Sequence, residues 1–263
     1  KFAPSCVMST PIVEIFLIYT LVKAGITETL TVLQYEFGYA VLEALRTGEA
    51  PEVADGDTSV IFTSSELGLK VNIAVIGCGI WGENIARNAS ELGVLACVCD
   101  SNRDRAFSFS QKFSCPAFSF DQILNDNNLN GVIIATNANT HEKLACEALN
   151  ARKHVYVEKP LALSMSSALS IKQCAINANK QVMVGHLLQY HPAYVELKNF
   201  VNDGFIGKLQ HVQATRLAMG RIKKFESALF DLCPHDISQI LGIVKEVPTS
   251  INCRNATHVE HSD

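Results

Sequence analysis

A glycine-rich turn between an apolar run and a helical pattern constrains the fold of this chain more than any other feature. The run Val71–Ile76 (VNIAVI) predicts a buried strand, and the hexapeptide Gly77–Gly82 (GCGIWG) follows it directly. Beyond the turn, apolar residues recur with helical spacing on one face and Gly93 marks a stop. This strand–turn–helix unit is typical of a parallel α/β sheet.

The three glycines of this turn have different tasks when such a unit binds a dinucleotide. Gly77 permits the tight turn, Gly79 lets the backbone approach a pyrophosphate, and Gly82 lets the helix pack closely on the strand. The N–H groups at the start of the helix, around Ile80 and Trp81, would then hold the phosphates. We therefore interpret the turn as a cofactor-binding site.

An acidic residue lies where the adenosine ribose of such a cofactor would bind. The second predicted strand, Val94–Cys99, ends in Asp100, and an acid at this position accepts hydrogen bonds from the ribose hydroxyls. A carboxylate repels a 2′-phosphate, so NAD is favoured over NADP, although Arg103 nearby weakens that preference. The alternative is a structural glycine turn with an unrelated surface acid.

The remaining pattern divides the chain into three parts. Residues 71–188 predict a doubly wound parallel sheet, a Rossmann fold, whose later strands are Gly131–Thr136, His154–Val157 and Gln181–Val184, with Thr140 as a helix N-cap. Residues 1–70 predict a helical extension and linker without evident chemistry. Residues 189–263 predict the start of an incomplete α+β substrate domain, with a helix from Pro192, a helix over Pro234–Val244, and strands at Leu209–Leu217 and Thr249–Cys253.

Composition excludes several classes of protein. The 22 Lys and Arg against 26 Asp and Glu give a net charge of −4 without a basic stripe, which argues against nucleic-acid binding. No apolar stretch is long enough to predict a membrane span. The nine cysteines show no CxxC spacing, so we interpret them mainly as reduced, buried thiols of a cytoplasmic protein and expect no metal site.

Four further motifs follow predicted strands or begin helices. They are Ala135–His141 (ATNANTH), Glu158–Pro160 (EKP), Gly185–Pro192 (GHLLQYHP) and Asp231–Asp236 (DLCPHD). Together with the glycine turn, they resemble the glucose–fructose oxidoreductase and inositol dehydrogenase family (Gfo/Idh/MocA), over roughly residues 71–240. The resemblance implies an NAD-binding half. The sequence from Gly185 onward resembles that of members that act on nucleotide sugars.

The same resemblance implies roles for individual residues. Lys159 would contact both the nicotinamide and the substrate, His235 would accept the proton, and Asp231 would accompany it in a D-x-x-x-H pair. The family loop beside the cofactor maps to Thr136, Asn137 and His141, and the EKP segment adds Glu158. The family usually has proline where Asn137 and Ala138 stand in this chain.

The chemistry of these residue types fits hydride transfer. Oxidation of a carbinol requires loss of the hydroxyl proton, which a neutral histidine can accept, while a lysine stabilises the developing alkoxide. The alternatives are a capping or surface role for His235, a solvated Lys159 and a surface Asp231. His186, His191 and the segment 216–221 could bind a substrate phosphate or carboxylate, or could be ordinary loop residues.

The sequence thus predicts an NAD-dependent oxidoreductase that takes a hydride from a sugar or nucleotide-sugar hydroxyl, as a homo-oligomer in its full-length form. Two alternatives stay open. One is a relative that uses NAD transiently to eliminate or hydrolyse a glycoside, and the other is a non-catalytic NAD-binding module. Because the substrate domain looks incomplete, we expect the chain to bind cofactor but to turn over substrate poorly.

Overall fold

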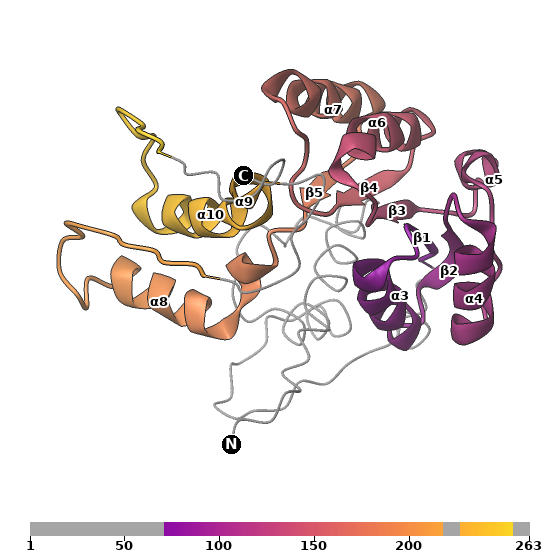
Figure 1. The fold of residues 1–263 in the computed structure, drawn as a ribbon, viewed down its shortest axis with the longest axis horizontal. Coiled ribbons are helices and arrows are strands. Elements are labelled where there is room, and N and C mark those ends of the chain that lie inside the picture. Colours follow the sequence, from indigo (N-terminus) through magenta and orange to yellow (C-terminus); the bar gives the residue numbers. More distant parts are fainter. Residues whose placement is uncertain (1–70, 218–226, 255–263) are drawn as a thin grey trace, which may run out of the picture. The chain divides into compact units, whose positions relative to one another are not determined.

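The computed structural model describes residues 71–217 and 227–254. The chain divides into two compact units, residues 1–183 and 184–263, which are described separately (Figure 1). The helices predicted in residues 1–70 lie outside the described part. The predicted end of the NAD-binding domain at residue 188 stays a prediction.

The first unit is built on a five-stranded sheet with the order β2-β1-β3-β4-β5. Its strands are β1 (Ile73–Ile76), β2 (Leu95–Cys99), β3 (Gly131–Ile134), β4 (His154–Val157) and β5 (Val182–Val184). β1 pairs in parallel with both β2 and β3, and β3 pairs in parallel with β4. The chain therefore moves one way from β1 to β2 and the other way from β3 to β5, which confirms the doubly wound sheet and places its switch point between β1 and β3.

Helices cover both faces of this sheet, which explains why the strands are apolar runs rather than alternating patterns. They are α3 (Ile80–Glu91), α4 (Arg103–Phe113), α5 (Phe120–Asn125), α6 (His141–Asn150, after the 3₁₀ turn Ala138–Thr140) and α7 (Met165–Ala178). Side chains of Asn102, Ser119 and Ser164 cap three of them. α3 and α4 pack on one face, and α5, α6 and α7 on the other.

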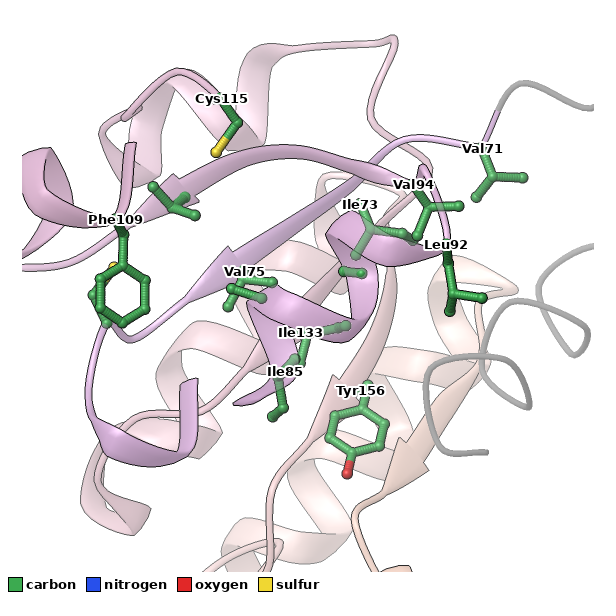
Figure 2. Packing of buried hydrophobic residues seen from close by; sticks show 14 residues of the cluster. Val71, Ile73, Val75, Ile85, Leu92, Val94, Phe109, Cys115, Ile133 and Tyr156 are labelled. Carbon is green, nitrogen blue, oxygen red and sulfur yellow. The ribbon is translucent and has the colours of Figure 1, made fainter. Parts of the chain in front are cut away.

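The core on the α3 side joins three strands to that helix. Val75, Ile133 and Tyr156 come from β1, β3 and β4, and Ile85 comes from α3; Figure 2 shows them as neighbours in one cluster. All four are at most 6% exposed. Full burial of an aliphatic side chain contributes about 1.5–3 kcal/mol, so this cluster fixes α3, and with it the glycine turn, against the sheet.

Thr140 occupies the N-cap position of α6, but its predicted capping bond is not formed. The Thr140 hydroxyl instead donates to the carbonyl oxygen of Asn137 over 2.7 Å and also pairs with the Thr136 hydroxyl. The Thr140 hydroxyl is thus bonded within the loop and 3₁₀ turn that precede α6.

The second unit contains a 3₁₀ turn, η3 (Leu187–Tyr190), and the helices α8 (Pro192–Asn202), α9 (Ala228–Asp231) and α10 (Cys233–Val244). The Tyr194 hydroxyl donates to the carbonyl oxygen of Gln239 over 2.7 Å. A Cβ at Gly242 would lie 2.3 Å from that hydroxyl oxygen, so α8 and α10 approach closely there. The helices predicted from Pro192 and over Pro234–Val244 are thus confirmed.

The prediction of two strands in this unit is wrong for the described residues. Neither Leu209–Leu217 nor Thr249–Cys253 forms a strand. Their β-type patterns reflect local preference, but a strand forms only with a hydrogen-bonded neighbour, and the described part of this unit supplies none.

Among the described residues, no helix combines the length and apolar character that crossing a membrane requires.

We expect the stability of the first unit to rise between about pH 4 and pH 6.5 because of His154. Burial, and secondarily the charge of Lys180, lower the pKa of His154 to about 4 from its usual 6.5. Between these two pH values, His154 is protonated in the unfolded chain but not in the folded one. Its contribution to the free energy of unfolding is therefore fully present above pH 6.5 and is lost as the pH falls toward 4. The full loss from this group is about 3 kcal/mol.

Denaturant unfolding at several pH values measures this effect. His154→Asn is the matched variant, because an amide oxygen can still accept from the Gln181 N–H, as the His154 Nδ1 does over 3.3 Å. The free energy of unfolding of this variant should depend less steeply on pH, because the contribution of His154 is removed. An unchanged slope would show that His154 does not control this pH range.

Candidate functional site

The glycine turn lies at the carboxyl end of β1, where three strands are tied together by backbone hydrogen bonds. The Gly77 N–H donates to the Cys99 carbonyl oxygen over 2.8 Å, and the Ala135 N–H donates to the Ile76 carbonyl oxygen over 2.8 Å. Gly77 has a φ of +104°, and a Cβ there would lie 2.5 Å from the Ala135 carbonyl oxygen. Only glycine fits this turn, as the sequence predicts.

The other two glycines differ sharply in their surroundings. A Cβ at Gly82 would lie 1.8 Å from the Gly77 carbonyl oxygen, so helix and turn are in direct backbone contact. A Cβ at Gly79 would meet nothing within 4 Å, and Gly79 is the N-cap of α3 without a side-chain cap. The start of α3 therefore presents backbone N–H groups to open space, which fits the pyrophosphate of a dinucleotide.

Asp100 is bound to this turn. Its Oδ2 accepts from the Cys78 N–H over 2.7 Å, and its Oδ1 accepts from the Asn102 N–H over 2.7 Å. Asp100 also forms an ion pair with Arg105, at 3.1 Å. Arg103, which the sequence analysis names as weakening the preference for NAD, lies exposed at the start of α4. The side chain of Asp100 is only 7% exposed. Arg105 is not predicted from the sequence, because its approach to Asp100 depends on where α4 begins after Asn102.

The buried cysteines around the turn are poor nucleophiles. Burial, aided by the nearby charge of Asp100, raises the pKa of Cys78 to about 12, and burial raises that of Cys97 to about 12. Burial and Asp100 likewise raise the pKa of Cys99 to about 11. These thiols stay protonated near neutral pH and pack as small apolar side chains.

His141 connects the loop after β3 with the EKP segment after β4. Its side chain is 1% exposed, with Nδ1 2.9 Å from the Pro160 carbonyl oxygen and Nε2 3.1 Å from the Thr136 carbonyl oxygen. The imidazole therefore joins two loops at the carboxyl edge of the sheet. Asn137, also predicted to contact the cofactor, lies exposed in the same loop.

The EKP segment continues β4 beyond its last residue, Val157. The Glu158 N–H donates to the Ile134 carbonyl oxygen over 2.9 Å, so the segment stays beside the end of β3. Glu158 is 6% exposed, Lys159 is half-buried, and the Lys159–Pro160 peptide bond is cis. The structure thus brings Lys159 and the glycine turn to the same edge of one sheet.

Asp231 and His235 belong to the second unit. Asp231 ends α9 and His235 lies in the first turn of α10, with Leu232 as a turn between the two helices. The segment is therefore not the continuous helix that would place Asp231 one turn before His235. Next to His235, Asp236 accepts two hydrogen bonds from Arg216 Nε and a third, of 2.7 Å, from its Nη2. This Arg216–Asp236 pair was not predicted, and it fixes α10 to the extended segment before residue 218.

Within the described ranges, no three His, Cys, Asp or Glu side chains gather in a way that would hold a metal ion. Three features at one edge of the sheet suit a dinucleotide: the uncapped start of α3, the acid that follows β2 and the lysine that follows β4. Parallel α/β sheets bind their ligands at this edge, next to the switch point.

Residues 71–186 match the model of an oxidoreductase family with an NAD-binding Rossmann fold, Gfo/Idh/MocA. The chain is 26% identical over 188 residues to an inositol 2-dehydrogenase of Salmonella typhimurium, covering 68% of this chain and 56% of that protein. It is 29% identical to a UDP-N-acetylglucosamine 3-dehydrogenase of Acidithiobacillus ferrooxidans, covering 70% and 57%. The chain spans little more than half the length of these relatives.

A solved structure, of a putative myo-inositol dehydrogenase from Sinorhizobium meliloti, shares the fold. The TM-score is 0.61 at 22% identity, covering 68% of this chain and 56% of that one. This likeness agrees with the Rossmann topology of the sheet described above.

Proposed function

From the match of residues 71–186 to the Gfo/Idh/MocA oxidoreductase family model with its NAD-binding Rossmann fold, we propose that this protein oxidises a hydroxyl group of a sugar or nucleotide sugar, with NAD as the hydride acceptor. Relatives named for inositol and for UDP-N-acetylglucosamine support this substrate class. The observation that carries the proposal is that the glycine turn, Asp100 and Lys159 all lie at the same edge of the sheet.

Each residue has a task in this proposal. The turn at Gly77, Gly79 and Gly82, with Ile80 and Trp81 at the helix start, holds the pyrophosphate, and Asp100 accepts from the adenosine ribose. The loop residues Thr136, Asn137 and His141 and the EKP glutamate, Glu158, complete the cofactor site.

Three further residues are assigned to the substrate by their motifs. Bound NAD supplies the hydride acceptor. Lys159 stabilises charge on the substrate oxygen, and His235 accepts the hydroxyl proton, with Asp231 as the accompanying acid. These three assignments rest on the D-x-x-x-H and EKP motifs and on the position of Lys159 at the ligand-binding edge.

We expect the chain to bind NAD about tenfold or more tightly than NADP, a difference of about 1.4 kcal/mol. The Asp100 carboxylate can accept from a ribose diol but repels a 2′-phosphate, and Arg105 offsets only part of its charge. Calorimetric titration with both cofactors measures the preference. Equal or tighter binding of NADP would contradict this assignment of Asp100.

Asp100→Asn is the informative variant, because its amide oxygen still accepts from the Cys78 N–H while the charge is removed. The ratio of the NADP dissociation constant to the NAD dissociation constant should become smaller in this variant. Asp104→Asn is the matched control, since Asp104 is an exposed acid in the first turn of α4. It should leave the preference unchanged; an equal effect of both changes would point to net charge rather than to a ribose contact.

Accumulation of NADH during turnover distinguishes the proposed oxidation from a reaction that uses NAD only transiently. With sugars and nucleotide sugars as substrates, NADH should accumulate in proportion to product. Glycoside cleavage without net NADH would contradict oxidation, and NAD binding without any turnover would favour a binding module.

A further inference from the structure

One charged pair holds the first turn of α10 from outside the helix. Asp236 accepts from Arg216 Nε at both carboxylate oxygens, over 3.0 and 2.9 Å, and from Arg216 Nη2 over 2.7 Å. The side chain of Arg216 is 31% exposed and that of Asp236 is 20% exposed, so most of the pair is shielded from solvent. Hydrogen bonds between charged groups are stronger than neutral ones, and several together also fix the geometry. Arg216 therefore fastens the extended segment before residue 218 to α10 at a defined point.

Two neutral contacts hold the residues that follow in α10. Gln189 Nε2 donates to the Ser238 carbonyl oxygen over 2.6 Å. The Tyr194 hydroxyl donates to the Gln239 carbonyl oxygen over 2.7 Å. These donors belong to η3 and α8. Together with the charged pair, they anchor the first half of α10 to three other segments of the second unit.

His235 directly precedes Asp236 in the anchored turn. Because the two residues share one helical turn, a contact that fixes Asp236 also fixes the backbone that carries the imidazole. The Ser238 hydroxyl adds to this order by donating to the His235 carbonyl oxygen over 2.8 Å. A general base must lie within hydrogen-bond reach of the proton that it accepts, so its direction from the helix matters.

The pair also affects the charge beside His235. A carboxylate close to an imidazole favours the protonated form of the ring, and a protonated histidine cannot accept a further proton. Asp236 is the chain neighbour of His235, and the Arg216 guanidinium balances its charge at 2.7 Å. With the pair intact, Asp236 can hold the helix without adding an unbalanced negative charge next to His235.

We infer that Arg216 is a positioning residue for His235: through Asp236 it fixes the first turn of α10 and balances the negative charge beside the proton acceptor. This inference rests on the proposed function, because it takes His235 as the proton acceptor. It also changes the task of Arg216, which the sequence analysis places in a segment that could bind a substrate phosphate or carboxylate. The described hydrogen bonds of its side chain go to Asp236 instead.

Titration of His235, followed by NMR on the full chain with labelled histidine, measures the charge effect. Arg216→Ala leaves the Asp236 carboxylate unbalanced and should raise the pKa of His235 by about half a unit or more. Asp236→Asn leaves the guanidinium unbalanced and should lower it. The double variant removes both charges and should return the pKa close to that of the unaltered chain. A purely structural role of the pair would not give opposite signs in the two single variants.

Tyr194→Phe is the matched control, because it removes another anchor of α10 without changing any charge. It should lower the stability of the second unit and leave the titration of His235 unchanged. Arg216→Gln takes the place of Arg216→Ala if the alanine variant does not fold, since glutamine removes the charge but can still donate to Asp236. An unchanged pKa of His235 in the single charge variants, or shifts of the same sign, would overturn the inference.

Kinetics of the catalytically competent form measure the positioning effect. At a pH where His235 is neutral, Arg216→Ala should lower kcat for a sugar or nucleotide sugar about tenfold or more, because a displaced base is less effective. Arg216→Lys should restore part of kcat, since it keeps the charge but not the planar pairing geometry. A raised KM with unchanged kcat would make Arg216 a substrate-binding residue and would overturn the inference. Absence of any sugar oxidation by the unaltered protein would contradict the proposed function instead, and the titration would still show whether Arg216 balances Asp236.

Discussion

Alanine at Gly82 should abolish NAD binding and destabilise the first unit. The added Cβ would lie 1.8 Å from the Gly77 carbonyl oxygen and 2.9 Å from its carbonyl carbon, and both are backbone atoms that cannot rotate away. α3 would have to move off the turn, and Ile85 would lose its packing against the sheet. We expect a loss of several kcal/mol of unfolding free energy, as for other severe overpacking, and at least about 100-fold weaker NAD binding.

Alanine at Gly79 separates binding from folding. Its Cβ would enter open space, so the melting temperature should stay within a few degrees of the unaltered chain. The same methyl group would lie where a pyrophosphate approaches the helix start, so NAD binding should weaken about tenfold or more. Thermal unfolding and calorimetry on the two variants measure both effects. Normal NAD affinity in Gly79→Ala would contradict the location of the pyrophosphate, and a stable Gly82→Ala would contradict the close contact of helix and turn.

The sequence predicts this part of the molecule well because short-range rules determine it. The glycine spacing allows one backbone path, and buried parallel strands require the apolar runs that mark β1, β2, β3 and β4. The observed strand bounds lie within two residues of the predicted ones. The same local rules predict a helix at Pro192, which α8 confirms.

Contacts between distant residues were not predictable in this way. The ion pair of Arg105 with Asp100 is one example, because it depends on where α4 begins after β2. His141 was predicted beside the cofactor, but a residue's motif does not reveal that both of its ring nitrogens face backbone carbonyl oxygens. The strand predicted at Leu209–Leu217 failed for a related reason, since a strand depends on a neighbour that local sequence does not contain.

The largest expected effects on catalysis are at Lys159 and His235. Lys159→Ala removes the proposed charge stabiliser at the carboxyl edge of the sheet, and His235→Ala removes the proposed proton acceptor. Each should lower kcat for a sugar or nucleotide-sugar substrate about 100-fold or more, because a positioned base or a charge that stabilises the transition state contributes at least this much. NAD affinity should stay within about threefold, since the pyrophosphate and ribose contacts come from other residues.

Steady-state kinetics in the catalytically competent form of the protein, with calorimetry for NAD, separates the two effects. Lys172→Ala and His211→Ala are matched controls, because both residues are exposed and lie outside the proposed site. Lys159→Arg adds a sharper test: it keeps the charge but changes its shape and reach, so partial activity would indicate a charge role and full loss a role that needs the compact ammonium group. If Lys159→Ala or His235→Ala kept near-normal kcat, the role assigned to that residue would be wrong. If either change instead abolished NAD binding, the residue would belong to the cofactor site rather than to the chemical step.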